Sequence, residues 1–415
     1  MLSQWFQPEP FFKGLPLAKA FRARGHEVEV LTGFPNYPGG KVYRGYRIAP
    51  CCRETIDGVR VNRVALYPSH DRSGTRRIVN YLSFAASAAF LGPLIVRRPH
   101  VVYVFNLLTL GIAARVLRQL RGAGIVLDVQ DLWPDSVEAS GMLRNRMLIS
   151  VLRSWCLAEY RRPDRIVVLS PGFKHELAAR GVSPTKIDVI YNWCDESAIV
   201  VPAHNNPQIP ADARPDGFTV VFAGTMGVMQ GLDVLIDAAM RIREIAPDVS
   251  FLMVGGGVEV PRLMNRASGL PNVRFLPAMP MSQIGSVFAV ADAMLVHLKD
   301  DPLFRITIPS KIQAYMYAGK PILCGLRGEG AELVSRAEAG ISFSPGDPDS
   351  LVSAVLRLRR LPTEERRRMG ERGRAYYQKH LAFDIGVRRL EQVLVRAANS
   401  RRAPIGEVSP STQAG

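Results

Sequence analysis

Cysteine is scarce in this sequence, and its spacing suits neither a metal site nor a disulfide framework. The 415 residues include five cysteines, with no Cys-x-x-Cys pair and no Cys/His ligand spacing. An odd number of cysteines scattered over such a length is typical of reduced thiols in the cytosol. The amino end shows no apolar leader, because Pro8, Glu9 and Pro10 come within its first residues. We therefore expect a cytoplasmic protein.

Long apolar runs are lacking as well. The longest run, 81–96, has sixteen residues and is interrupted by Ser83, Ser87, Gly92 and Pro93, whereas a bilayer span needs about twenty. With 47% apolar and 22% charged residues, the composition excludes a multi-span membrane protein and a largely disordered chain. A chain of 415 residues is too long for one hydrophobic core and suits two domains.

Several catalytic motifs are missing. The sequence has no Gly-x-Ser-x-Gly, no Walker sequence, no G-x-G-x-x-G dinucleotide fingerprint and no His-x-x-x-His. Asp347-Pro348-Asp349 forms an Asp-x-Asp, but it follows Gly346 between an expected strand and an expected helix. A helix N-cap is therefore favoured over a metal ligand at Asp347. The sequence therefore offers no convincing metal site.

Lysine and acidic residues are few compared with arginine. Nine Lys and 44 Arg face 37 acidic residues, which leaves a net charge of +16. GC-rich codon usage would explain the preference for Arg over Lys, but not the net excess. The excess suggests a polyanionic neighbour: nucleic acid, an anionic membrane surface or a phosphate-bearing substrate.

Helices and strands are expected to alternate along the chain. Apolar periodicity predicts helices at 15–23, 81–96, 110–120 and 148–160, each followed by a strand, at 28–32, 101–104, 125–129 and 165–169. The pattern dissolves over 195–217, an expected linker, and resumes over 218–382. Such alternation predicts two doubly wound α/β domains, 1–194 and 218–382. A last helix at 383–398 is expected to return to the first domain, before a disordered tail at 400–415.

Two loops of the second domain are candidates for holding phosphate. The first loop follows a strand and leads into a helix, where backbone amides can face an anion, and it contains Gly224, Thr225, Gly227 and Gln230. An ordinary tight turn is the alternative. Gly255 follows the next strand. Pro309-Ser310-Lys311, downstream of Arg305, is expected to begin a helix, so that the lysine lies in the first helical turn. A cation is unfavourable beside the positive end of a helix unless an anion shares the site. A lysine on a surface helix is the alternative.

The first domain offers a candidate acid and two loops. Asp131, braced by Trp133, ends an expected strand and suits a base or an orienting group, with an acidic N-cap as the alternative. Lys13 and Gly14 lead into the first helix and are able to face a diphosphate, although a plain surface loop fits equally well. The loop that contains Asn36 and Tyr37 is expected beside them.

These motifs resemble those of family 4 glycosyltransferases. The likeness rests on segments in family order and extends to about residue 395: 24–28, 31–38, Asp131-Leu132-Trp133-Pro134, Tyr191-Asn192-Trp193 and Pro309-Ser310-Lys311. Within that family the sequence is similar to a bacterial surface-polysaccharide branch that includes L-fucosamine transferases.

The resemblance implies a GT-B fold, in which two Rossmann-like domains face each other across a cleft. It implies transfer of a sugar from a nucleotide-diphosphate donor, with retention of configuration and without a bound metal or another cofactor. The departing diphosphate must then be stabilised by side chains and helix dipoles, here Lys311, Arg305, Lys13 and the amides of the 224–231 loop. Asp131 is expected near the transferred sugar and the acceptor hydroxyl, with Asn36, Tyr37 and Trp133 on the acceptor side.

The sequence departs from the wider family at three places. Two glutamates that many members carry fall at Ile306 and Ala314, so ribose recognition must differ, with Glu332 as a possible substitute. The family's histidine before the acid is Gln130 here. A basic pair after the first strand of the second domain is missing from 225–230.

The acceptor is expected to be lipid-linked, an undecaprenyl-diphosphate sugar at the inner membrane face. Five arginines flank the apolar segment 81–96, a layout suited to anionic lipid: Arg72, Arg76, Arg77, Arg97 and Arg98. A plain core helix is the alternative for that segment. Two other functions remain open, a sugar-nucleotide epimerase of the same fold and a nucleic-acid-binding protein. The second is disfavoured, because aromatics are not interleaved with arginine in one patch.

Overall fold

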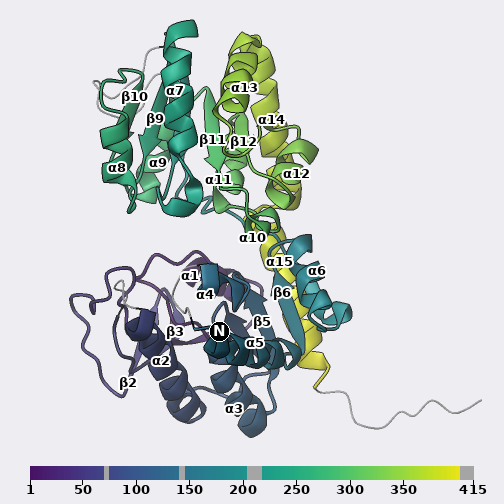
Figure 1. Ribbon diagram of the computed structural model, residues 1–415. Helices are drawn as coiled ribbons and strands as arrows, with labels where there is room; N and C mark the ends of the chain where they lie inside the picture. The colour runs from purple at the N-terminus through teal and green to yellow at the C-terminus, as the bar shows by residue number, and fades with distance from the viewer. Residues whose placement is uncertain (70–73, 140–144, 203–216, 402–415) are drawn as a thin grey trace, which may run out of the picture. The chain divides into compact units, whose positions relative to one another are not determined.

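Figure 1 presents a computed structural model, in which residues 1–69, 74–139, 145–202 and 217–401 are described. The chain divides into two compact units. Unit 1 comprises Met1–Val168, Lys174–Ile190 and the carboxyl-terminal segment from Val387, and unit 2 comprises Leu169–Phe173 and Tyr191–Gly386. The units meet in the sequence at 190/191 rather than at the expected 194/195. The expected linker lies largely outside the described residues, as does the expected tail beyond residue 401.

The sheet of unit 1 is parallel apart from one hairpin. Its strands, in spatial order, are β2 (Cys51–Ile56), β3 (Val59–Val64), β1 (Glu29–Gly33), then β4 (Val101–Phe105), β5 (Gly124–Val129), β6 (Arg165–Val168) and β7 (Ile187–Val189). Leu2 forms parallel bridges to both Leu31 and Val104 and so joins the two groups of strands. The first strand of this doubly wound unit is thus reduced to a single bridging residue. The antiparallel β2–β3 hairpin was not predicted.

Helices alternate with these strands. They are α1 (Leu15–Ala23), α2 (Gly74–Ile95), α3 (Gly111–Arg121), α4 (Asp135–Ala139), α5 (Arg146–Arg161) and α6 (Pro171–Ala179). The helix α2 begins seven residues before the expected start at 81, and it packs against α3. By length and composition α2 could cross a membrane, but 39% of its apolar window is buried inside the protein, including Phe84 and Ala88. That burial makes α2 a core helix of unit 1 with one outward face.

Unit 2 has six parallel strands. Their order is β10 (Val273–Leu276), β9 (Val249–Val254), β8 (Phe218–Ala223), β11 (Ala293–His297), β12 (Ile322–Gly325) and β13 (Gly340–Ser342). The helices are α7 (Asp233–Ile245), α8 (Val260–Arg266), α9 (Met281–Ala289), α10 (Pro302–Arg305), α11 (Ser310–Ala318), α12 (Glu329–Arg336), α13 (Pro348–Arg360) and α14 (Thr363–His380). Apolar side chains from β8, β9 and α7 form the core, among them Phe222, Phe251 and Leu235. The strand order reverses between β8 and β11, which marks the topological switch point.

The last helix, α15 (Phe383–Asn399), begins in unit 2 and belongs to unit 1 from Val387 onward. The Glu391 carboxylate accepts a hydrogen bond from Arg24 at 2.6 Å and lies 2.7 Å from Nε2 of His26. The end of the helix lies so close to β5 that a Cβ on Gly124 would be 2.4 Å from the Ala397 carbonyl oxygen. These contacts give His26 a structural role, since its ring helps to hold α15 on unit 1.

Candidate functional sites

The first candidate site lies at the switch point of unit 2, where ligands of open α/β sheets bind. The loop after β8, Gly224–Gly231, meets the end of β11 there. The ring of His297 is buried, its Nδ1 lies 2.6 Å from the Gln230 carbonyl oxygen, and its Nε2 accepts the Gly346 amide at 2.9 Å. Burial lowers the pKa of His297, so the neutral imidazole donates to Gln230 and holds the loop in place.

Glycine backbone packs directly on glycine backbone in this site. Gly255 has φ +144°, and a Cβ there would lie 2.0 Å from the Gly224 carbonyl oxygen. The loop amides are less available than the sequence suggested, because the N–H of Gly224 donates to Val254 and that of Gly227 to the Gln230 side chain. The expectation that the amides of Gly224 and Gly227 face a phosphate is therefore wrong, because these amides close the loop.

Lys311 brings a positive charge to the same place. Its Nζ lies 4.4 Å from the centre of the Phe222 ring, and a Cβ on Gly224 would meet the Nζ at 3.0 Å. Burial lowers the pKa of Lys311 to about 8. Within the described part of the chain no carboxylate pairs with this ammonium group, whereas half-buried arginines such as Arg118 and Arg180 each have one. The structure thus brings Lys311 and the Gly224 loop together.

Other residues expected at this site lie less directly on it. Pro309 and Ser310 begin α11 beside Lys311, and Thr225 is exposed on the loop. Arg305 pairs with Asp300 at 2.9 Å, and the same carboxylate pairs with Arg327. Glu332 is exposed in the first turn of α12. Among the described residues, neither Arg305 nor Glu332 forms a hydrogen bond or an ion pair with Lys311.

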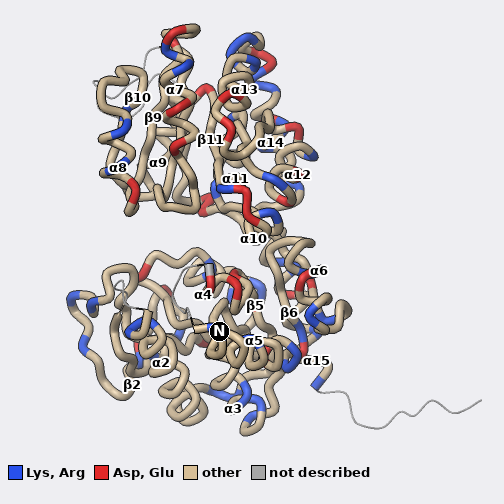
Figure 2. Tube along the Cα trace, viewed as in Figure 1, with Lys and Arg blue, Asp and Glu red and all other residues tan. Residues whose placement is uncertain are grey.

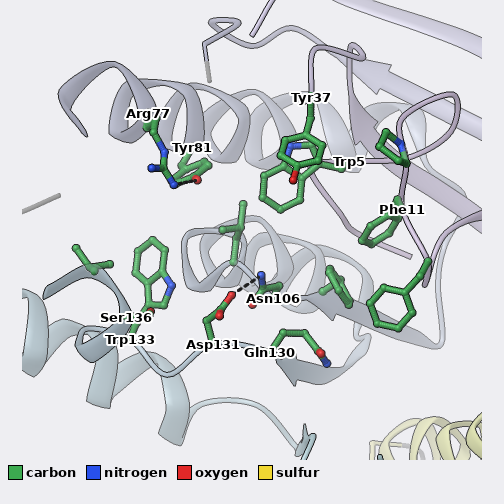
Figure 3. A pocket seen from close by; sticks show the side chains of 15 residues that line it. Trp5, Phe11, Tyr37, Arg77, Tyr81, Asn106, Gln130, Asp131, Trp133 and Ser136 are labelled. Atoms are coloured by element: carbon green, nitrogen blue, oxygen red, sulfur yellow. Dashed lines mark hydrogen bonds between the residues drawn. The ribbon is translucent and has the colours of Figure 1, made fainter. Parts of the chain in front are cut away.

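The second candidate site is a pocket of about 490 Å³ in unit 1, within the usual range for ligand pockets. Figure 3 shows its walls, which are mainly aromatic. Trp133 and Tyr37, both expected on the acceptor side, line it together with Asp131. The remaining aromatic rings were not singled out from the sequence: Trp5, Phe11, Phe12, Tyr81 and Phe105.

Asp131 is the carboxyl group of this pocket. Desolvation raises the pKa of Asp131, while a hydrogen bond from Asn106 Nδ2 to its Oδ2, 3.2 Å long, opposes the rise. Asn106 follows β4 and has φ +63°, a left-handed conformation that asparagine tolerates better than most residues. The adjacent parallel strands β4 and β5 therefore end in a matched amide and carboxyl group. The acidic N-cap interpretation of Asp131 is not supported, since α4 begins four residues later, at Asp135.

Glu9 fixes the position of Tyr37. The Glu9 side chain is buried and accepts the backbone amides of Asn36 at 2.7 Å and Tyr37 at 2.8 Å. The loops 7–14 and 34–41 are thus neighbours, as expected. Asn36 itself is fully buried, and its Nδ2 donates to the Phe34 carbonyl. It supports the loop from behind and does not line the pocket, which corrects its expected acceptor role.

Lys13 and Gly14 also lie behind the pocket. The Lys13 ammonium is 1% exposed and forms a 2.7 Å ion pair with buried Asp128, whose carboxylate also accepts the Tyr103 hydroxyl. Gly14 is buried against the Gln7 side chain, which accepts the Leu15 amide and caps α1. Neither residue is placed to face a diphosphate. Their role is to anchor α1 to β5.

In the described ranges no cluster of three or more His, Cys, Asp or Glu side chains is placed to hold a metal ion. Asp347 accepts the amides of Asp349 and Ser350 at 3.0 and 3.2 Å, so it caps α13 as expected.

The parallel sheets and the two candidate sites define a class of protein with GT-B architecture. The glycosyl transferase 4-like domain family matches residues 15–193, and the glycosyl transferases group 1 family matches residues 217–360. Together these matches span most of the chain. The protein is therefore a glycosyltransferase of the family 4 type.

Curated relatives support this placement. The chain is 25% identical over 311 residues to the putative colanic acid biosynthesis glycosyl transferase WcaI of Escherichia coli K12, covering 72% of this chain and 74% of the relative. It is 27% identical to the probable glycosyltransferase WbjE of Pseudomonas aeruginosa, over 58% of this chain and 61% of the relative.

Solved structures share the fold. An α,α-trehalose-phosphate synthase (UDP-forming) from Burkholderia vietnamiensis superposes with a TM-score of 0.72 at 15% identity, covering 98% of this chain and 99% of that one. HepE of Anabaena, solved in complex with UDP and glucose, gives a TM-score of 0.65 at 15% identity, covering 95% and 98%. Both establish the GT-B fold.

Proposed function

We propose that the protein transfers a sugar from a nucleoside-diphosphate donor bound by unit 2 to a saccharide acceptor bound in the pocket of unit 1. The observation that supports this most is the Lys311 ammonium group, half-buried at the switch point of the sheet. Its lowered pKa reports a desolvated cation, and a bound diphosphate would supply the missing counter-charge. UDP and UDP-glucose in the HepE structures agree with a donor of this kind.

In this proposal each side chain has a separate task. Lys311 offsets the charge that develops on the departing diphosphate. Asp131 accepts the hydrogen of the attacking hydroxyl, as a base or an orienting group, and Asn106 holds the carboxyl group in position. The aromatic walls orient the acceptor and keep water away from it. On the strength of the family resemblance, we also propose that the reaction retains the configuration of the sugar and needs no metal. The same resemblance is the basis for proposing that the protein belongs to the branch of the L-fucosamine transferases.

The outer face of α2 supports a lipid-linked acceptor. Val79, Leu82, Phe90 and Leu94 follow one another at helical spacing and are all exposed, Phe90 by 83% and Leu94 by 75%. Between Asp71 and Asp128 the sequence has eight arginines and no acidic residue. The charged residues of α2 and α3 are therefore all basic (Figure 2). An apolar stripe with basic flanks favours adsorption to anionic lipid.

The acceptor proposed is therefore an undecaprenyl-diphosphate saccharide, reached by a cytoplasmic enzyme peripheral to the inner membrane. The printed name of WcaI, which refers to colanic acid biosynthesis, agrees with a role in surface polysaccharide. Arg76, Arg97 and Arg98 lie at the two ends of α2. Arg72, which was expected to take part, is outside the described residues.

The donor site is tested by measuring nucleotide binding without metal. We expect one nucleoside diphosphate from a panel to raise the thermal midpoint, and Lys311→Ala to weaken its binding about tenfold or more, as for a lost charge-assisted contact. Lys379→Ala, an exposed lysine on α14, is the matched control and should bind normally. Equal affinity of Lys311→Ala and the parent protein would remove Lys311 from the donor site.

Vesicle co-sedimentation tests the membrane surface. We expect binding to phosphatidylglycerol vesicles but not to phosphatidylcholine vesicles, and a loss of about tenfold or more in Phe90→Glu, since burial of one such side chain contributes about 1.5–3 kcal/mol. Val258→Glu, at a 66% exposed position of unit 2, should bind as the parent does. Binding that Phe90→Glu leaves intact would exclude this face of α2, and a dimer in solution that the variant dissociates would assign the face to a second copy.

A further inference from the structure

The pocket of unit 1 contains a cation for which the proposed chemistry gives no task. Arg77, on α2, lines the pocket and is half-buried. Its Nε is shielded from solvent and has no hydrogen-bond partner among the described residues, and its Nη2 lies 3.5 Å from the Tyr81 hydroxyl. In Figure 3, Arg77 and Tyr81 stand on the α2 side of the pocket, across from Asp131 and Asn106.

Several other half-buried arginines of unit 1 are paired with carboxylates. Arg115 pairs with Glu159, Arg118 with Asp164 and Arg180 with Asp135. Arg77 has no such ion pair among the described residues. A desolvated guanidinium without an anion is unfavourable, so its place beside an aromatic cavity indicates that the anion is supplied by the ligand.

The chemistry of the pocket narrows the class of ligand. Guanidinium groups bind phosphate and carboxylate through two parallel hydrogen bonds. Aromatic faces such as those of Trp5, Tyr37 and Trp133 pack well against the apolar C–H face of a sugar ring. A volume of about 490 Å³ accommodates a ring together with an anionic substituent.

We propose that the acceptor pocket recognises an anionic saccharide, with Arg77 binding its phosphate or carboxylate group while Asp131 faces the hydroxyl that reacts. This inference rests on the proposed function and names the substrate class of its acceptor. In a lipid-linked acceptor the anionic group is the diphosphate on the first sugar, of which the sugar-linked phosphate is the nearer part. In an acidic saccharide it is the carboxylate of a uronic acid.

Tryptophan fluorescence provides the measurement, because Trp5 and Trp133 line the pocket. The probes are glucose 1-phosphate, glucuronic acid, glucose and inorganic phosphate, titrated into the full chain and into Lys311→Ala to remove any contribution from unit 2. We expect at least one anionic sugar to bind about tenfold tighter than glucose. We expect Arg77→Gln to abolish that preference and Arg77→Lys to restore part of it. Arg76→Gln, the same charge change one residue away, should keep the preference.

Each outcome decides the matter. A preference for glucose 1-phosphate alone assigns the site to phosphorylated sugars, and one for glucuronic acid alone assigns it to uronic acids. Three results would overturn the inference. They are equal affinity for charged and neutral sugars, a preference for the anionic sugar that survives in Arg77→Gln, and binding of inorganic phosphate as tight as that of the sugar phosphate. Nucleotide binding, measured separately on the same protein, tests unit 2, so a failure of the proposed function is recognised independently.

Discussion

The two units place their candidate sites at the same topological position, beyond the carboxyl ends of parallel strands, but build them from different materials. Unit 2 uses close-packed glycine backbone and one ammonium group, Lys311, whose burial lowers its pKa to about 8. Unit 1 uses large aromatic side chains around the carboxyl group of Asp131, whose pKa burial raises. The site of unit 2 suits the negative charge that all nucleotide donors share, and the site of unit 1 suits the shape of a particular acceptor. The site of unit 2 should therefore depend on the charge of Lys311 and on its glycine packing, and the site of unit 1 on the carboxyl group of Asp131.

The largest effect is expected at the carboxyl group of unit 1. Asp131→Asn should lower the rate of sugar transfer about 100-fold or more, the scale of a lost acid–base group. The thermal midpoint should not fall, because burial already disfavours the charged form of Asp131. The rate is measured at saturating donor, with Asp57→Asn on the exposed β2–β3 turn as the control. A variant that keeps half of the parent rate would exclude Asp131 from the chemistry.

Glycine packing makes unit 2 sensitive to a single methyl group. Gly255→Ala would place its Cβ 2.0 Å from the Gly224 carbonyl oxygen at a φ of +144°, so we expect a loss of about 1–3 kcal/mol in the stability of unit 2 and weaker donor binding. Gly256→Ala is the neighbouring control, since its Cβ would meet Ala278 at an ordinary 3.8 Å. Thermal unfolding and nucleotide titration measure both variants, and equal behaviour of the two would refute the close approach.

The pH dependence of donor binding tests the lysine directly. The pKa of Lys311 in the free protein is lowered to about 8, so the ammonium form that binds a diphosphate is lost as pH rises through that value. Donor affinity should fall about tenfold between pH 7 and pH 9. Lys311→Arg, whose guanidinium stays charged, should show a flat profile by calorimetry. A flat profile in the parent protein would contradict the assignment.

The smallest effect is expected at the amide that supports Asp131. The hydrogen bond from Asn106 lowers the pKa of Asp131 against the rise caused by desolvation. Removing it in Asn106→Ala should raise that pKa by up to about one unit, the worth of one hydrogen bond. Because the ionised carboxylate is the active form, the acidic limb of the pH–rate profile should move to higher pH. An unchanged acidic limb of the pH–rate profile would show that Asn106 does not affect the pKa of Asp131.

Regular periodicity made most of the fold predictable. Strands at 101–104 and 125–129 and helices at 15–23 and 148–160 match β4, β5, α1 and α5 to within a few residues. The β2–β3 hairpin was missed because polar residues are buried in it. Arg63 is fully buried and donates to the Gly33 carbonyl at 2.9 Å, so the strand lacks an alternating apolar pattern.

The candidate sites were only partly predictable. Asp131, Trp133 and Lys311 follow recognisable strand or helix ends, and Asn106, directly after β4, carried the same signal but was overlooked. Lys13 was misjudged because its partner, Asp128, is 115 residues away, and sequence spacing does not reveal such a pair. The aromatic walls come from five separate segments, so their convergence depends on the tertiary fold.

The shared helix α15 sets the order in which the protein can be completed during synthesis. Most of unit 1 precedes unit 2 in the sequence, yet the helix that packs on β5 and holds Arg24 through Glu391 follows unit 2. Domains usually fold as they leave the ribosome, amino-terminal ones first. Here unit 1 gains its last packing helix only after unit 2 has been made.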